Sequence, residues 1–155
     1  NFELYLWGTL WHGVDQLQSN QNSVQVNTQV TWKTGLHAAL ARARAAVLPT
    51  VNRSFGELVV YEAMALGKPV IAFALGANPT LIRSGIDGLL VPPGDIDALA
   101  EAVKRVHTDV DFAAALGHSA AERARQLWSN ESVYATYDAA YQIAIRKRHI
   151  DQLHH

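Results

Sequence analysis

The sequence of 155 residues contains no cysteine, so it has neither a disulfide framework nor thiol chemistry, which fits a reducing cytoplasm. It has no apolar run near the ~20 residues that a membrane span needs, and no visible signal peptide. Its 13 basic and 14 acidic side chains give a net charge of −1, so neither nucleic acid nor an anionic membrane is expected as the main partner. With 49% hydrophobic residues, we expect one domain, residues 1–155, with a sizeable core.

Several motifs that carry chemistry are missing as well. No Walker motif and no Gly-x-Gly-x-x-Gly follows an expected strand, so neither a P-loop NTPase nor a dinucleotide oxidoreductase is favoured. No strand ends in the acidic cluster that a Mg²⁺-dependent phospho-acceptor receiver requires. The seven histidines lack metal-ligand spacing, so no metal site is expected. Ser119 lies in a segment similar to a hydrolase nucleophile elbow, but no strand precedes it, and we expect no catalytic role.

Short apolar runs alternate with amphipathic segments along the chain. This alternation predicts an α/β fold, a doubly wound Rossmann-like parallel sheet with right-handed crossovers. The expected strands are residues 2–7, 24–30, 45–48, 70–74 and 88–91. The expected helices are residues 34–44, 54–66, 78–85, 95–107, 111–128 and 129–147.

Two of the later helices carry specific expectations about their side chains. In the helix over residues 95–107, Asp95 is the expected N-cap, and helical spacing predicts an inward-facing stripe. The members of that stripe are Ile96, Leu99, Val103 and Val106. In the last helix, three tyrosines recur at i, i+3 and i+7, a pattern typical of packing rather than of chemistry. They are Tyr134, Tyr137 and Tyr141.

The helix over residues 54–66 has clear start and stop signals. Ser54 and Glu57 have the spacing of a capping box, in which each side chain satisfies an orphan backbone amide. Gly67 stands at the expected C-cap, and Pro69 prevents the helix from continuing. Between these signals the helix is apolar nearly all round, which predicts a buried helix.

One carboxylate, Glu62, interrupts that apolar helix. A buried carboxylate without a partner is unfavourable by several kcal/mol, so Glu62 needs an ion-pair partner, a proton or an opening onto a cleft. At an open edge it could accept hydrogen bonds from a polyol such as ribose. The start of the helix, where Gly56 lets a ligand approach the backbone, suits an anion such as phosphate. The alternative is a half-exposed Glu62 paired with a nearby Arg or Lys.

The same stretch closely resembles the C-terminal, donor-binding half of retaining glycosyltransferases of family four, which have the two-domain GT-B architecture. In that family a strand ending in Pro-Ser leads to a Phe-Gly helix start and then to Glu-Ala-Met-Ala-x-Gly-x-Pro-Val. The resemblance covers about the whole chain and is dense from Ala45 to Val103. The matching segments are Pro49-Thr50, Phe55-Gly56, Glu62 to Val70, Ile71 to Pro79 and Gly85 to Asp95.

The resemblance implies roles for individual residues. Glu62 would hold the ribose hydroxyls of a nucleotide-sugar, and Gly76 and Ala77 match a Gly-Gly turn beside the sugar. The helix start would meet the donor sugar or the diphosphate, through backbone amides of Gly56, Glu57 and Leu58 beside Phe55. The turn at Gln29 and Val30 lies where the family contacts the base.

Three features depart from the family pattern. The first of the family's two glutamates, which usually holds a hydroxyl of the donor sugar, falls here on Ser54, or on Arg53 when counted from Phe55. Thr80 stands where the Gly-Gly turn normally continues to a glutamate. The family's domain also begins one strand earlier, and the loop after that strand usually supplies an Arg and a Lys to the diphosphate. Arg53 is a candidate substitute for those cations.

We therefore expect the nucleotide-sugar-binding half of a retaining glycosyltransferase involved in polysaccharide biosynthesis. By resemblance, the donor is a UDP- or GDP-hexose, the acceptor is a glycan or a lipid-linked sugar, and no further cofactor is needed. An N-terminal acceptor-binding domain is the expected partner, and it could bring the cytoplasmic protein to the inner membrane surface. This chain alone is expected to be inactive.

Two alternatives remain open on the sequence. The first is an enzyme related to GT-B nucleotide-sugar epimerases, whose acid and base carboxylates would lie in the other domain. The second is a degenerate, non-catalytic Rossmann-like domain that serves protein interaction, an option that Ser54 and Thr80 keep open.

Overall fold

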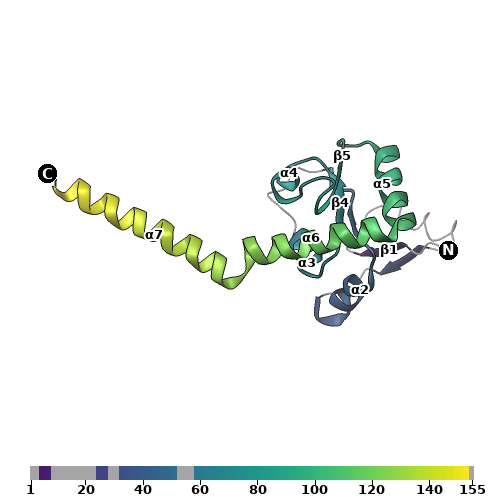
Figure 1. Ribbon diagram of the computed structural model, residues 1–155, viewed down its shortest axis with the longest axis horizontal. Coiled ribbons are helices and arrows are strands. Elements are labelled where there is room, and N and C mark those ends of the chain that lie inside the picture. Colours follow the sequence, from purple (N-terminus) through teal and green to yellow (C-terminus); the bar gives the residue numbers. More distant parts are fainter. Residues whose placement is uncertain (1–3, 8–23, 28–31, 52–57, 154–155) are drawn as a thin grey trace.

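The computed structural model describes residues 4–7, 24–27, 32–51 and 58–153, with side-chain surroundings for residues 33–51 and 58–146 (Figure 1). Strand β1 (Leu4–Trp7) pairs in parallel with β2 (Val24–Asn27). A second parallel sheet has the order β3 (Ala46–Leu48), β4 (Val70–Phe73), β5 (Gly88–Val91), so β4 is its central strand. The parallel α/β fold predicted from the sequence is confirmed.

The helices follow the strands in the predicted alternation. The described helical elements are η1 (Trp32–Thr34), α2 (Leu36–Arg42), α3 (Leu58–Ala65), α4 (Asn78–Leu81), α5 (Ile96–Thr108), α6 (Val110–Trp128) and α7 (Asn130–Leu153). The predicted end signals are confirmed where the structure describes them. Asp95 caps α5 by accepting a hydrogen bond from the Ala98 amide at 2.9 Å. Gly67 ends α3 with φ 68°, and the next amide, of Lys68, donates to Ala63 O at 2.8 Å.

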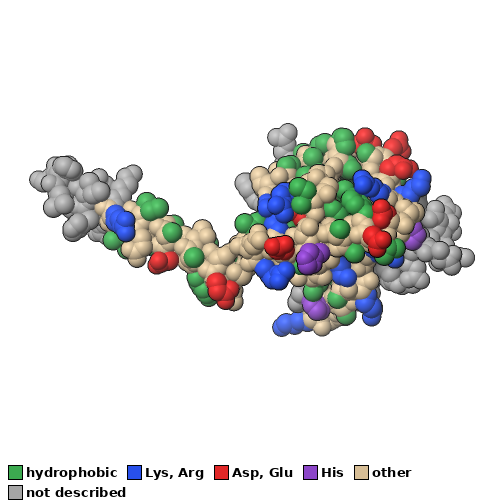
Figure 2. Space-filling model, in the orientation of Figure 1, with side chains coloured by type: hydrophobic (Ala, Val, Ile, Leu, Met, Phe, Trp, Pro, Cys, Tyr) green, Lys and Arg blue, Asp and Glu red, His purple; other side chains and the backbone are tan. Residues whose placement is uncertain are grey.

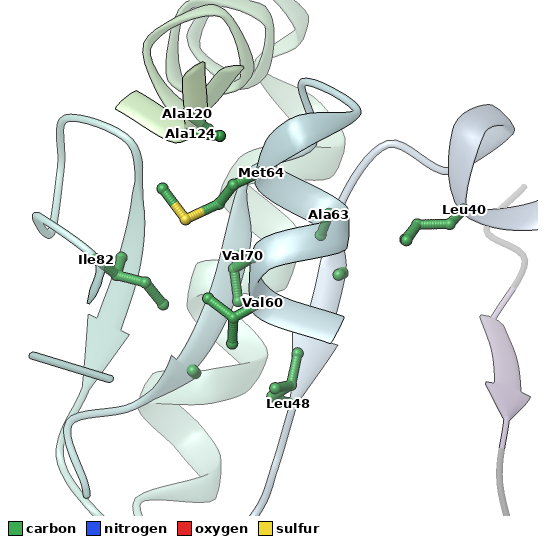
Figure 3. Close-up of a cluster of buried hydrophobic side chains, with 11 residues drawn as sticks. Leu40, Leu48, Val60, Ala63, Met64, Val70, Ile82, Ala120 and Ala124 are labelled. Atoms are coloured by element: carbon green, nitrogen blue, oxygen red, sulfur yellow. The ribbon is translucent and has the colours of Figure 1, made fainter. Parts of the chain in front are cut away.

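Side chains alternate between the two faces of the second sheet, as the pleat requires. On one face, Val70 and Ala72 of β4 join a cluster with Val60, Ala63 and Met64 of α3. Figure 3 shows Val60, Met64, Val70 and Ile82 converging between α3 and the sheet. On the other face, the neighbouring residues of β4 join a cluster with β5 and α5. Its members from these elements are Ile71, Phe73, Leu89, Val91, Leu99 and Val106.

Helix α6 contributes to both clusters. Ala113 and Leu116, from its first half, lie with the α5 cluster, whereas Ala120 and Ala124 lie with the α3 cluster. Between these two pairs, Gly117 lies against the turn that ends α3. Helix α6 therefore adds side chains to the hydrophobic core on both faces of the second sheet.

Two expectations about the burial of apolar side chains were wrong. Helix α3 is not buried all round, because Leu58 is 76% exposed while the stripe of Val60, Ala63 and Met64 is fully buried. Ile96 is 63% exposed, although Leu99 and Val106 further along the same stripe are buried. The apolar stripe is continuous in the sequence, but the core covers only the part after the first turn of α5.

The three tyrosines of α7 also do not pack against the rest of the described chain. Figure 1 shows α7 extending away from the other elements, and Figure 2 shows hydrophobic side chains uncovered along it. The exposed large side chains of α7 are Tyr134, Tyr137, Tyr141, Ile143 and Ile145. Across the described helices, none is both long enough and apolar enough to cross a bilayer.

Candidate functional site

The carboxyl ends of β3, β4 and β5 lie at one edge of the second sheet, because the three strands are parallel and in register. Leu48 at the end of β3 pairs with Ala72, and Phe73 at the end of β4 pairs with Val91. The segments that leave this edge are therefore neighbours. In open parallel sheets, ligands bind outside these strand ends, so this edge is the candidate site.

Helix α3 follows β3 at this edge and carries Glu62. Its side chain is half-buried, and the helical period places it away from the fully buried stripe of Val60, Ala63 and Met64. Within the described part of the chain, no ion pair or side-chain hydrogen bond engages its carboxylate. The Arg or Lys partner of the alternative interpretation is therefore not found among those residues, and the acid can accept hydrogen bonds from a ligand.

The turn after β4 holds two predicted site residues, Gly76 and Ala77. Gly76 has φ 59°, a left-handed conformation that side chains disfavour, and this explains the glycine. Neither residue's amide donates a hydrogen bond within the described chain. The turn is anchored beside them, because the buried Asn78 donates from Nδ2 to Phe73 O at 3.1 Å. The turn thus presents two consecutive N–H groups that have no acceptor among the described residues.

Sequence reasoning missed an ionic cluster that involves the segment between α4 and β5. Asp87, fully buried before β5, accepts hydrogen bonds from the Arg83 backbone amide and from Arg83 Nε, both at 2.6 Å. Arg123 Nε of α6 lies 3.7 Å from the same carboxylate. A buried aspartate demands a cationic partner, but sequence alone could not show that the partner lies on a distant helix.

The other predicted site residues fall largely outside the described residues. These are Val30, Arg53, Ser54, Phe55, Gly56 and Glu57, and their roles stay predictions. Leu58, the first described residue of α3, is exposed. Glu62, Gly76 and Ala77 all lie on segments that leave the same sheet edge.

Two shallow hollows of the described surface lie elsewhere. One, of about 490 Å³, is lined by β5 and α5 and includes Arg105 and Thr108. The other, of about 460 Å³, lies on α6 between His118 and Gln126. Among the described side chains, groups of histidine and acidic residues that could hold a metal ion are not found. Neither hollow includes Glu62, Gly76 or Ala77.

Solved structures share this fold. Sucrose-phosphate synthase from Thermosynechococcus elongatus superposes with a TM-score of 0.79 at 30% identity, over 94% of this chain and 39% of that chain. Anabaena HepE, in complex with UDP, superposes with a TM-score of 0.78 at 22% identity, over 92% of this chain and 41% of that chain. The fold is that of the C-terminal, donor-binding domain of GT-B glycosyltransferases.

The chain belongs to the family Glycosyl transferases group 1, whose profile matches residues 1–109. Curated relatives agree with this assignment. A D-inositol 3-phosphate glycosyltransferase of Kribbella flavida is 39% identical over 97 residues, which is 63% of this chain and 22% of that protein. An exopolysaccharide phosphotransferase of Streptomyces coelicolor is 41% identical over 83 residues, 53% of this chain and 9% of that protein. The matched region is thus a quarter or less of the length of these relatives.

Proposed function

We propose that this chain binds a nucleotide-sugar, a UDP- or GDP-hexose, across the carboxyl edge of the β3–β5 sheet. Glu62 accepts hydrogen bonds from the ribose hydroxyls, and the start of α3 meets the diphosphate. The free amides of Gly76 and Ala77 face the sugar. The observation that carries the proposal is Glu62, a half-buried carboxylate on an otherwise apolar helix, with no partner among the described residues.

The chain's place in a larger protein is part of the proposal. This chain corresponds to 39% and 41% of the length of the two solved neighbours described above. A second domain would bind the glycan or lipid-linked acceptor, and the two would transfer the hexose with retention of configuration in the cytoplasm. HepE has been solved with UDP and with UDP-glucose, which supports a uridine nucleotide as the first donor to test. Because the second domain excludes water from the reacting sugar, this chain alone binds donor weakly and transfers none.

Calorimetric titration with UDP, UDP-glucose, GDP and GDP-mannose tests the proposal, with Glu62→Gln as the variant. The amide keeps the shape of the side chain and removes its charge. Hydrogen bonds to charged groups contribute roughly 1.5–3 kcal/mol, so we expect an increase in Kd of about tenfold or more. Glu101→Gln is the matched control, because Glu101 is exposed on α5 and, among the described residues, its carboxylate pairs only with the exposed Lys104, at 3.5 Å.

Saturable binding by the wild-type protein and the Glu101→Gln variant, with weaker binding by Glu62→Gln, would support the proposal. Equal and unsaturable heats for all three proteins would contradict it. That second result would favour the degenerate interaction domain, which also agrees with Ser54 and Thr80 at the family's glutamate positions.

A further inference from the structure

Arg123 of α6 is distant in the sequence from the candidate site, but its guanidinium contacts the end of α4. Nε donates a hydrogen bond to Leu81 O at 3.0 Å, and Nη2 donates to Thr80 O at 3.1 Å. The side chain is only 19% exposed. These carbonyls belong to the last turn of α4, where a helix leaves acceptors unsatisfied and its dipole favours a cation.

Asp87 holds this guanidinium in place. Its carboxylate is fully buried, and its Oδ2 lies 3.7 Å from Arg123 Nε. Asp87 is itself fixed by the two hydrogen bonds from Arg83. Arg123 therefore joins three segments: α6, the end of α4 and the turn before β5. A planar guanidinium with several fixed donors suits such a junction, whereas a lysine ammonium could not make the same set of contacts.

The opposite end of α4 is the Gly76–Ala77 turn. Asn78, the first residue of α4, is bonded to the end of β4, and Thr80 Oγ1 donates to Ala77 O at 2.7 Å. Helix α4 has four residues, so it is only about 6 Å long. A shift at its Thr80–Leu81 end is therefore transmitted directly to the two free amides of the turn.

We propose that Arg123 is a positioning residue for the sugar part of the donor. By anchoring the carboxyl end of α4 to α6 and Asp87, it fixes the Gly76–Ala77 turn against the sugar. The nucleotide part meets α3 instead. This inference rests on the proposed function. It adds that α6, through Arg123, strengthens binding of the nucleotide-sugar relative to binding of the free nucleotide.

The test compares Arg123→Gln with Arg125→Gln in the full chain. Arg125 is two residues further along α6, is exposed, and donates from Nε to Ala121 O of its own helix, so it is a matched control. We expect Arg123→Gln to weaken UDP-glucose binding by about tenfold, since small misplacements of binding groups have effects of this order, while UDP binding changes less than about twofold. Arg123→Lys keeps the charge but not the fork of donors, and we expect a partial recovery.

Hydrogen exchange gives a second measurement that needs no ligand. The amides of Thr80, Leu81 and Ile82 donate within or at the end of α4. We expect Arg123→Gln to speed their exchange without changing that of β4, and Arg125→Gln to leave both unchanged. Unchanged exchange in α4, or equal weakening of UDP and UDP-glucose, would overturn the inference. A wild-type protein that binds no nucleotide would overturn the proposed function instead.

Discussion

At Gly117, α6 lies so close to the turn after α3 that no side chain fits. A Cβ built there would lie 2.2 Å from Gly67 O and 3.4 Å from Pro69 Cδ. The amides of Gly67 and Lys68 donate to Met64 O at 2.9 Å and to Ala63 O at 2.8 Å, so the Gly67 carbonyl cannot move away easily. The glycine in the Gly117–Ala121 segment is therefore explained by packing inside α6 and not by the strand-to-helix turn of a nucleophile elbow.

We predict that Gly117→Ala destabilises the protein. In an exposed helix the same change would add about 1 kcal/mol of stability, because alanine is the better helix former. Here the clash is with backbone, and overpacking typically costs about 1–3 kcal/mol, so after the helix gain we expect a net loss of up to about 2 kcal/mol. Urea unfolding measures the change.

Ser119→Ala, on the same helix, is the control for this prediction. Ser119 is half-buried, and we expect its removal to change stability by less than about 0.5 kcal/mol. A Gly117→Ala variant as stable as the wild-type protein would show that α6 can move away from Gly67.

Local signals in the sequence were sufficient to predict most secondary-structure elements. The run Val70–Phe73 became the central strand β4, fully buried, because a parallel sheet covered on both faces selects continuous apolar residues. The prediction failed where burial depends on distant elements. Ile96 and Leu99 belong to the same helical stripe in the sequence. Only the position of the core in the folded chain decides that Leu99 is buried and Ile96 is exposed. The contact between Asp87 and Arg123 could not be predicted for the same reason.

Helix α5 gives a prediction at the scale of one element. Its N-cap, Asp95, satisfies the amide of Ala98. Removing such a cap typically costs about 1 kcal/mol, so we expect Asp95→Ala to lower the free energy of unfolding by that amount. Urea unfolding, with Asp97→Ala as the control, measures it.

Asp97 lies in the first turn of the same helix and is exposed. Like Asp95 it places a negative charge near the positive end of the helix dipole, but it is Asp95 that accepts the capping hydrogen bond from the Ala98 amide. We expect Asp97→Ala to cost roughly 0.3–0.5 kcal/mol through the helix dipole alone. Equal losses for the two variants would contradict a specific role for the Asp95 side chain.

At the scale of the whole molecule, α7 contributes little to the stability of the rest. Its large side chains from Tyr134 to Ile145 are exposed, whereas the edge-to-face contact of Trp128 with Tyr61 lies before it. We predict that ending the chain after Ser132 changes the free energy of unfolding of the remainder by less than about 1 kcal/mol, as for changes away from a core.

Thermal and urea unfolding of the shortened chain, followed by tryptophan fluorescence, measure this effect. Ending the chain after Ala115 is the opposite control, because it removes the part of α6 that carries Leu116, Ala120 and Ala124. We expect that shorter chain not to fold. A shortened chain without α7 that also failed to fold would show that α7 supports the sheet.

The position of α6 also has a consequence for synthesis on the ribosome. The β3–β5 sheet is complete in sequence at Val91, but α6, which adds side chains to the core on both of its faces, ends only at Trp128. At about 5–20 residues per second, the newly made sheet lacks this helix for a few seconds of translation. During that interval the apolar side chains that α6 covers stay exposed on the nascent chain, so a translational pause before α6 would prolong its need for chaperones.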